Sequence, residues 1–137
     1  MTLSIDWLAV DAADPEKLAR FWCAALGYEI VHDGDDPEDG DHEVLIVGGN
    51  GGLRMLFLEN RDEKVVKNRL HLDFRPDDQE AEVKRLLELG ATEVDIGQGD
   101  RSWTVLADPE GNEFCVLRAG TPEELEERKQ MEAQGKW

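Results

Sequence analysis

Residues 14–28, DPEKLARFWCAALGY, indicate one complete helix with an identifiable residue at each end. Asp14 has the side chain of an N-cap, and Pro15 suits the first helical position because a backbone N–H would have no partner there. Gly27 is the residue type that most often ends a helix in the left-handed conformation. Apolar residues between these ends recur at helical spacing, so one face of the helix is expected to be buried.

The same pattern returns in the second half of the chain, in RPDDQEAEVKRLLELG, residues 75–90. Asp77 is the predicted N-cap, Glu80 would complete a capping box, and Gly90 would end the helix. One strand-like segment precedes each helix and three follow it. In the first half these segments are 2–10, 28–31, 43–49 and 53–59, and in the second they are 68–74, 91–96, 102–107 and 113–117. We therefore expect an α+β protein built from two βαβββ modules.

The division of the chain follows from this repeat. We expect one domain over residues 1–119, with module one at 3–59, a linker at 60–67 and module two at 68–118. Residues 120–137 are expected to form a C-terminal helix and tail, because Thr121 and Glu124 make a capping box around Pro122. The segment 33–43 carries seven acidic residues and is expected to be a solvated, mobile loop.

Composition narrows the class of function. The net charge of −17 leaves no excess of basic side chains, so nucleic acid and anionic membranes are not expected partners, whereas a cationic or neutral small molecule is. No segment approaches the ~18 apolar residues of a membrane span, and the N-terminus lacks the pattern of a signal peptide. The two cysteines, Cys23 and Cys115, do not make a disulfide framework, which favours a cytoplasmic protein.

Two motifs carry a family resemblance. The first helix contains FW-x-x-x-LG-Y over residues 21–28, and the turn before the last strand is DPEGNEF, residues 108–114. With its two modules over residues 3–118, the chain resembles the vicinal-oxygen-chelate superfamily of glyoxalases, bleomycin-resistance proteins and extradiol dioxygenases, and within it the small glyoxalase-like branch. The resemblance implies that the sheets form an incomplete barrel with a concave site, and that the chain pairs as a homodimer.

The resemblance also implies where metal ligands would lie, because metal-dependent members carry them on the first and last strands of each module. These positions fall at Trp7, Leu58, His71 and Cys115. Only His71 and Cys115 can bind a divalent metal, whereas a catalytic zinc site normally has three protein ligands. No metal or other cofactor is therefore predicted.

Two alternatives would restore a metal site. Asp73 could join His71 and Cys115 as a third ligand. A strand rise of ~3.3 Å per residue, however, would separate the His71 and Asp73 side chains by nearly ~7 Å, which suits two groups that line a pocket. A shift of one residue in the strand boundaries would instead give the metal triad Glu59, His71 and Glu113.

The expected ligand site is an aromatic-lined groove. Its residues are Trp7, Leu58, His71, Asp73, Trp103 and Cys115. Arginines that would bind anions if they faced this groove are Arg54, Arg69 and Arg101. Within the groove, His71 and Asp73 are the candidates for acid–base chemistry. Cys115 is a packing residue, a passive wall of the groove or, beside His71, an activated thiolate.

The leading hypothesis is a metal-independent protein that binds a cationic or aromatic small molecule, as bleomycin-resistance proteins do in grooves between subunits. The alternative is a lyase or isomerase of the glyoxalase-like class, with a reduced metal site or with proton transfer by His71 and Asp73. The number of possible metal ligands favours binding over catalysis.

Overall fold

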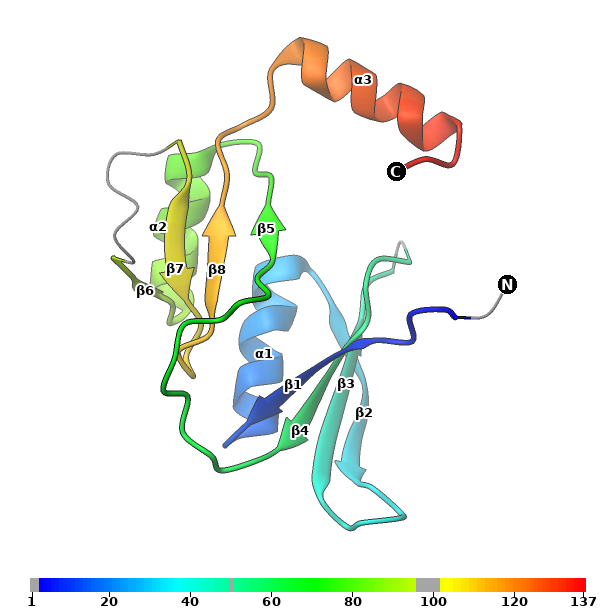
Figure 1. Ribbon diagram of the computed structural model, residues 1–137, viewed down its shortest axis with the longest axis vertical. Helices are drawn as coiled ribbons and strands as arrows, with labels where there is room; N and C mark the ends of the chain where they lie inside the picture. The colour runs from blue at the N-terminus through cyan, green and yellow to red at the C-terminus, as the bar shows by residue number, and fades with distance from the viewer. Residues whose placement is uncertain (1–2, 50, 96–101) are drawn as a thin grey trace.

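Each half of the chain folds into a four-stranded mixed sheet with one helix, as the repeat predicts (Figure 1). The computed structural model describes residues 3–49, 51–95 and 102–137. Sheet one has the order β1-β4-β3-β2 and comprises β1 (Leu8–Ala12), β2 (Glu29–Asp35), β3 (His42–Val47) and β4 (Met55–Glu59). Sheet two has the order β5-β8-β7-β6 and comprises β5 (Asp73–Phe74), β6 (Thr92–Glu93), β7 (Thr104–Ala107) and β8 (Glu113–Val116). The predicted α+β class with two βαβββ modules is confirmed, and over the described ranges the sheets stay open.

The first helix has the ends that the sequence predicts. In α1 (Pro15–Leu26) the Asp14 carboxylate accepts a 3.1 Å hydrogen bond from the N–H of Lys17. Gly27 ends the helix with a φ of 70°, in the left-handed region where a side chain would be strained.

The second helix, α2 (Gln79–Leu89), begins one residue later than predicted. Its N-cap is Asp78 rather than Asp77, and the Asp78 carboxylate accepts a 3.1 Å bond from the N–H of Ala81. The position expected for Glu80 in a capping box is therefore occupied by Ala81. Either aspartate could cap a helix, and Gln79 favours the later start because its side chain donates to the carbonyls of Ser102 and Val116 in module two.

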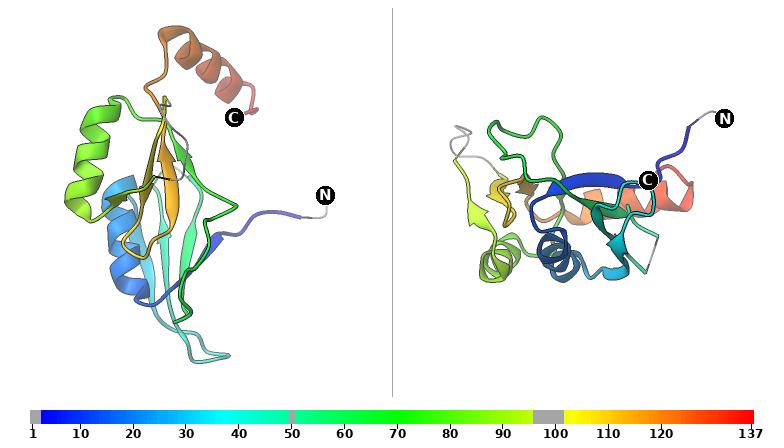
Figure 2. Two further views of the ribbon diagram at one scale, coloured as in Figure 1. Left: turned by 60° about the vertical axis from the view of Figure 1, so that its left-hand side comes forward. Right: turned by 90° about the horizontal axis from the view of Figure 1, so that it is seen from below.

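Both helices cover the same side of the two sheets and leave the opposite side open (Figure 2). The indole of Trp22 on α1 joins the two halves of the core, because it contacts Phe74 and Phe114 with ring centroids 5.7 and 5.0 Å away. Arg85 on α2 donates to the carbonyls of Ala24 and Ala25 at the end of α1, which ties the helices to each other.

Several strands are shorter than the sequence suggests, among them β1, β5 and β6, and residue 96 of the predicted strand 91–96 lies outside the described residues. β1 begins at Leu8, which lies opposite Met55 at the start of β4, so the residues ahead of Leu8 have no strand to pair with. β5 consists of Asp73 and Phe74 only. Residues 68–72, predicted as strand, are irregular, and Asn68 there bonds to the Glu113 carboxylate instead of entering the sheet.

The acidic segment 33–43 is a loop only over residues 36–41, whereas the sequence predicts a loop over its whole length. β2 continues to Asp35 and β3 begins at His42, so the two strands form a longer hairpin. His42 lies between two carboxylates, with Nε2 2.7 Å from Asp33 Oδ1 and Nδ1 3.2 Å from Asp35 Oδ1. One histidine therefore relieves the repulsion that the acidic composition suggested.

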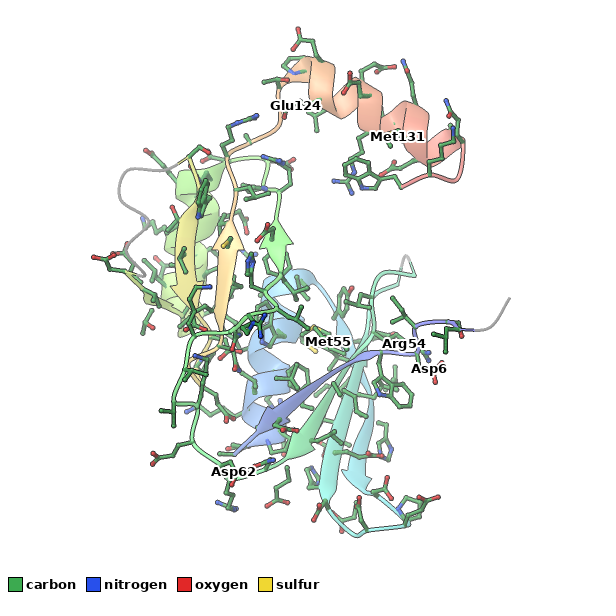
Figure 3. The ribbon with its side chains drawn as sticks, viewed as in Figure 1. Asp6, Arg54, Met55, Asp62, Glu124 and Met131 are labelled. Atoms are coloured by element: carbon green, nitrogen blue, oxygen red, sulfur yellow. The ribbon has the colours of Figure 1, made fainter. Side chains whose placement is uncertain are left out.

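The C-terminal helix α3 (Pro122–Ala133) has the predicted capping box of Thr121 and Glu124. It buries none of its residues and stands away from both sheets, as the positions of Glu124 and Met131 show (Figure 3). Arg118, which pairs with Glu124 at 2.6 Å, holds its first turn near the end of β8. None of the described helices is long and apolar enough to cross a membrane.

Candidate functional site

Four of the predicted site residues meet on the open side of sheet two. Phe114 and Val116 of β8 point into the core, so Cys115 between them points to the opposite face. A cavity of about 270 Å³ lies on this face. The predicted residues that line it are His71, Asp73, Trp103 and Cys115.

His71, Asp73 and Cys115 are closer together than strand spacing predicts. His71 Nδ1 lies 2.9 Å from Asp73 Oδ1, in place of the expected separation of nearly ~7 Å. That expectation is wrong because His71 precedes β5 and is not in a regular strand, so the two side chains can converge. One ligand atom from each of the three residues lies within 4.8 Å of the others, the one such group of His, Cys, Asp and Glu among the described residues.

The Cys115 thiol is a poor nucleophile in this setting. Burial, the charge of Asp73 and a hydrogen bond to Asp73 raise the pKa of the Cys115 thiol to about 11. The thiolate is the reactive form of cysteine, and with this pKa Cys115 stays a thiol near neutral pH. Cys115 and His71 therefore do not form an activated nucleophile there. The three groups instead form a chain in which the Asp73 carboxylate accepts from both the imidazole and the thiol.

The other two predicted residues, Trp7 and Leu58, belong to sheet one. Leu58 lies opposite Asp11 and Glu43 on the open face of β4, while Met55 and Phe57 fill the core. Trp7 precedes β1 and is 41% exposed. A single chain therefore does not bring Trp7 and Leu58 to the cavity that His71 lines.

Glu59 and Glu113, the ligands expected from a shifted register, each form an ion pair with a basic side chain. Glu59 pairs with Arg61 at 3.3 Å. Glu113 pairs with Lys64 at 2.9 Å and accepts from the N–H of Asn68. Burial acts to raise the pKa of the Glu113 carboxyl, but the bonds from Lys64 and Asn68 outweigh it and hold the pKa below its usual range.

Two of the three arginines considered as anion sites lie in the described part of the chain. The guanidinium carbon of Arg54 is 5.7 Å from the centre of the Trp7 ring, and Arg54 also lies beside Asp6 ahead of β1 (Figure 3). Arg69 lines a second, larger cavity of about 590 Å³ between the two modules. Arg101 lies outside the described residues.

The sequence did not predict the hydrogen bonds by which the DPEGN turn contacts the first module. Asp108, 3% exposed, accepts from the indole N–H of Trp22 at 3.2 Å and from the N–H groups of Glu110 and Asn112. Burial raises the pKa of Asp108, while these bonds oppose the rise. The Glu110 carboxylate accepts from the N–H groups of Ala13 and Asp14 at 2.6 and 3.0 Å. The turn therefore joins module two to the start of α1.

Two βαβββ modules with open sheet faces define the vicinal-oxygen-chelate class of proteins. Within this class, the chain belongs to the glyoxalase-like domain family, whose profile matches residues 7–117. No curated protein matches the chain by sequence.

Solved structures share the fold at low sequence identity. FosX, a fosfomycin resistance protein from Mesorhizobium loti, has a TM-score of 0.66 and 17% identity over 93% of this chain and 100% of its own. The trypanothione-dependent glyoxalase I of Leishmania major has a TM-score of 0.69 and 17% identity over 99% of this chain and 100% of its own. FosX from Listeria monocytogenes, solved with Mn(II) and sulfate, has a TM-score of 0.65 and 19% identity over 91% of this chain and 98% of its own.

Proposed function

We propose that the chain is a metal-independent protein that binds an aromatic or cationic small molecule on the open sheet faces. The observation that carries this proposal is the hydrogen-bonded set of His71, Asp73 and Cys115 on the wall of an accessible cavity. The Asp73 carboxylate accepts from the imidazole and the thiol there, and a thiol pKa of about 11 keeps the proton on Cys115 near neutral pH. The exposed edge of the imidazole can then hold a polar group of a ligand, while Trp103 offers an aromatic surface.

The types of ligand atom that His71, Asp73 and Cys115 offer favour this proposal over a manganese site like that of the Mn(II)-containing structure of FosX. Manganese prefers oxygen and imidazole ligands, and a thiol with a raised pKa is a poor substitute for a carboxylate. Zinc accepts the combination of His71, Asp73 and Cys115 in ligand type, but its binding would have to remove the proton from Cys115.

We also propose a homodimer in which sheet one of one copy faces sheet two of the other. The open face of sheet one carries the half-buried side chains of Leu45 on β3 and Leu58 on β4, which lie outside the core cluster. Apposed sheets would add Trp7 and Leu58 of a second copy to the cavity at His71, and would explain why one chain separates the predicted residues. The two free cysteines suit a cytoplasmic setting for this protein.

A second candidate is a zinc-dependent lyase or isomerase. It is favoured by the compactness of His71, Asp73 and Cys115, whose ligand atoms lie within 4.8 Å of one another. In that case the three side chains would hold the ion, and zinc would supply a Lewis acid that polarises a carbonyl.

Metal content decides between the two candidates. Untagged wild type, His71→Ala and the control His32→Ala are purified without chelator, analysed by elemental mass spectrometry and melted with and without EDTA. If the samples contain no metal and their Tm is the same with and without EDTA, the result supports a protein that binds its small molecule without a metal. Near-stoichiometric zinc that is lost in His71→Ala and kept in His32→Ala would favour the lyase or isomerase. A thermal-shift screen of aromatic cations, repeated on Trp103→Ala, then tests the binding itself.

A further inference from the structure

A larger cavity lies where the two modules join, next to the concave site but distinct from it. Its volume is about 590 Å³, within the range of roughly 300–1,000 Å³ that small-molecule sites occupy. β1 forms one wall, the start of β8 forms another, and the linker after β4 passes beside them (Figure 1). His71, Glu113 and Phe114 separate it from the smaller cavity, whereas Trp103 lines only the smaller one.

The inner surface of this junction cavity is apolar. Its large apolar residues that are buried or half-buried come from both modules and are Leu8, Val10, Trp22, Met55, Leu72 and Phe114. Such a surface can take the apolar body of a ligand, and the face or edge of Trp22 adds an aromatic contact.

The charged groups at the junction cavity are mostly acidic, and three of the carboxylates have no ion-pair partner among the described residues. Asp11, Asp62 and Glu63 line it without an ion pair to any residue that the structure describes. Asp62 lies on the linker just after β4 (Figure 3). Lys64 is already paired with Glu113, which leaves Arg69 as the lining cation without an ion pair among the described residues.

A buried carboxylate adds a second reason for a cation. Asp108 lines the cavity at 3% exposure, and its described hydrogen bonds come from neutral donors: an indole, an amide side chain and backbone N–H groups. Burial of this charge without a cation raises the pKa of Asp108. A positive group in the cavity would lower the cost of keeping that carboxylate ionised.

We propose that the junction cavity is a binding site for an organic cation with an apolar body, of the alkylammonium type. The apolar residues would hold the alkyl chain, and the carboxylates of Asp11, Asp62, Glu63 and Asp108 would attract the ammonium group. This site stands whether or not the concave face binds a ligand of its own.

The test is isothermal titration calorimetry of the full chain with n-hexyltrimethylammonium, n-hexanol and hexanoate at constant salt. The ammonium should bind more tightly than the alcohol, and hexanoate should bind least. Ala9→Phe places a ring in the cavity from an exposed position of β1, so it should abolish binding of the ammonium without changing the unfolding transition of the free protein.

Two further variants separate binding in the cavity from the effect of general charge. Asp11→Asn/Asp62→Asn/Glu63→Gln should weaken binding of the ammonium about tenfold. Its control, Glu123→Gln/Glu126→Gln/Glu127→Gln on α3, changes the net charge equally and should leave binding unchanged. The proposal is overturned if the ammonium does not bind, if the alcohol binds as tightly, if Ala9→Phe binds as wild type does, or if the control triple weakens binding as much.

Discussion

The indole N–H of Trp22 on α1 donates a 3.2 Å hydrogen bond to the buried carboxylate of Asp108 in the turn before β8. This bond joins the two motifs that mark the sequence, FW in the first helix and DPEGN in the second module. The same carboxylate closes its own turn by accepting from Glu110 and Asn112. The two motifs therefore act together as the joint between the modules and do not form the concave site.

Asp108→Ala should consequently destabilise the whole domain. The substitution leaves the Trp22 indole and two backbone N–H groups without their acceptor, so we expect a loss of roughly 2–4 kcal/mol in the free energy of unfolding. Urea unfolding followed by tryptophan fluorescence measures it. The control Asp62→Ala removes an exposed carboxylate and should stay within about 0.5 kcal/mol of wild type. Equal losses in both variants would show that the joint has no special role.

The β2–β3 hairpin should lose stability at alkaline pH. Hydrogen bonding to Asp35, followed by the bond and charge of Asp33, raises the pKa of His42 in the folded state. A raised folded pKa means that the stabilisation is fully present below the unfolded value of ~6.5 and is lost as pH rises through the folded pKa. The difference in unfolding free energy between wild type and His42→Gln should therefore shrink from about pH 6 to about pH 9.

The variants Asp33→Asn and Asp35→Asn complete this test. Each removes one carboxylate from the imidazolium, so an NMR titration of His42 should give a lower pKa than in wild type. A difference between wild type and His42→Gln that stays flat or grows with pH would contradict the role assigned to the ion pairs.

The fold could be predicted because its determinants are local. The first helix begins at Asp14 and Pro15 and ends at Gly27, as these residue types predict. The last helix likewise begins at its predicted N-cap, Thr121. What failed were strand ends and the cap of α2, which depend on distant partners. β1 starts where β4 offers a neighbour, and α2 starts where Gln79 reaches two carbonyls of module two.

The site was predicted less completely, for a related reason. The family resemblance placed His71 and Cys115 on the concave face, and strand alternation added Asp73 beside His71, but regular strand geometry kept His71 and Asp73 apart. Their contact depends on the irregular backbone ahead of β5, which no local pattern signals. The acceptor roles of Asp108 and Glu110 were equally hidden, because a turn sequence does not show which distant donors it will meet.

Cys115 should be unreactive near neutral pH and should respond to Asp73. With a thiol pKa of about 11, only about one part in a thousand is thiolate at pH 8, so alkylation by iodoacetamide should be slow. In a Cys23→Ala background, the pH–rate profile of alkylation should turn over near pH 11 in the otherwise wild-type chain. Asp73→Asn removes the charge and acceptor that help to raise this pKa, so the turnover should move to lower pH. A turnover near pH 8.5, or one that Asp73→Asn leaves in place, would contradict the hydrogen-bonded arrangement.

Sedimentation equilibrium tests whether the open face of sheet one is covered by a second copy. We expect wild type to be a dimer and Leu58→Asp to be a folded monomer, because a carboxylate buried in an apolar interface should weaken association at least about a hundredfold. Leu89→Asp is the matched control: Leu89 is 39% exposed at the end of α2, in the helical layer on the opposite side from the open face, so the dimer should persist. A monomeric wild type would remove the proposed apposition of sheets. A dimer that survives Leu58→Asp would place the interface elsewhere, and Trp7 would then not reach the cavity at His71 through a partner.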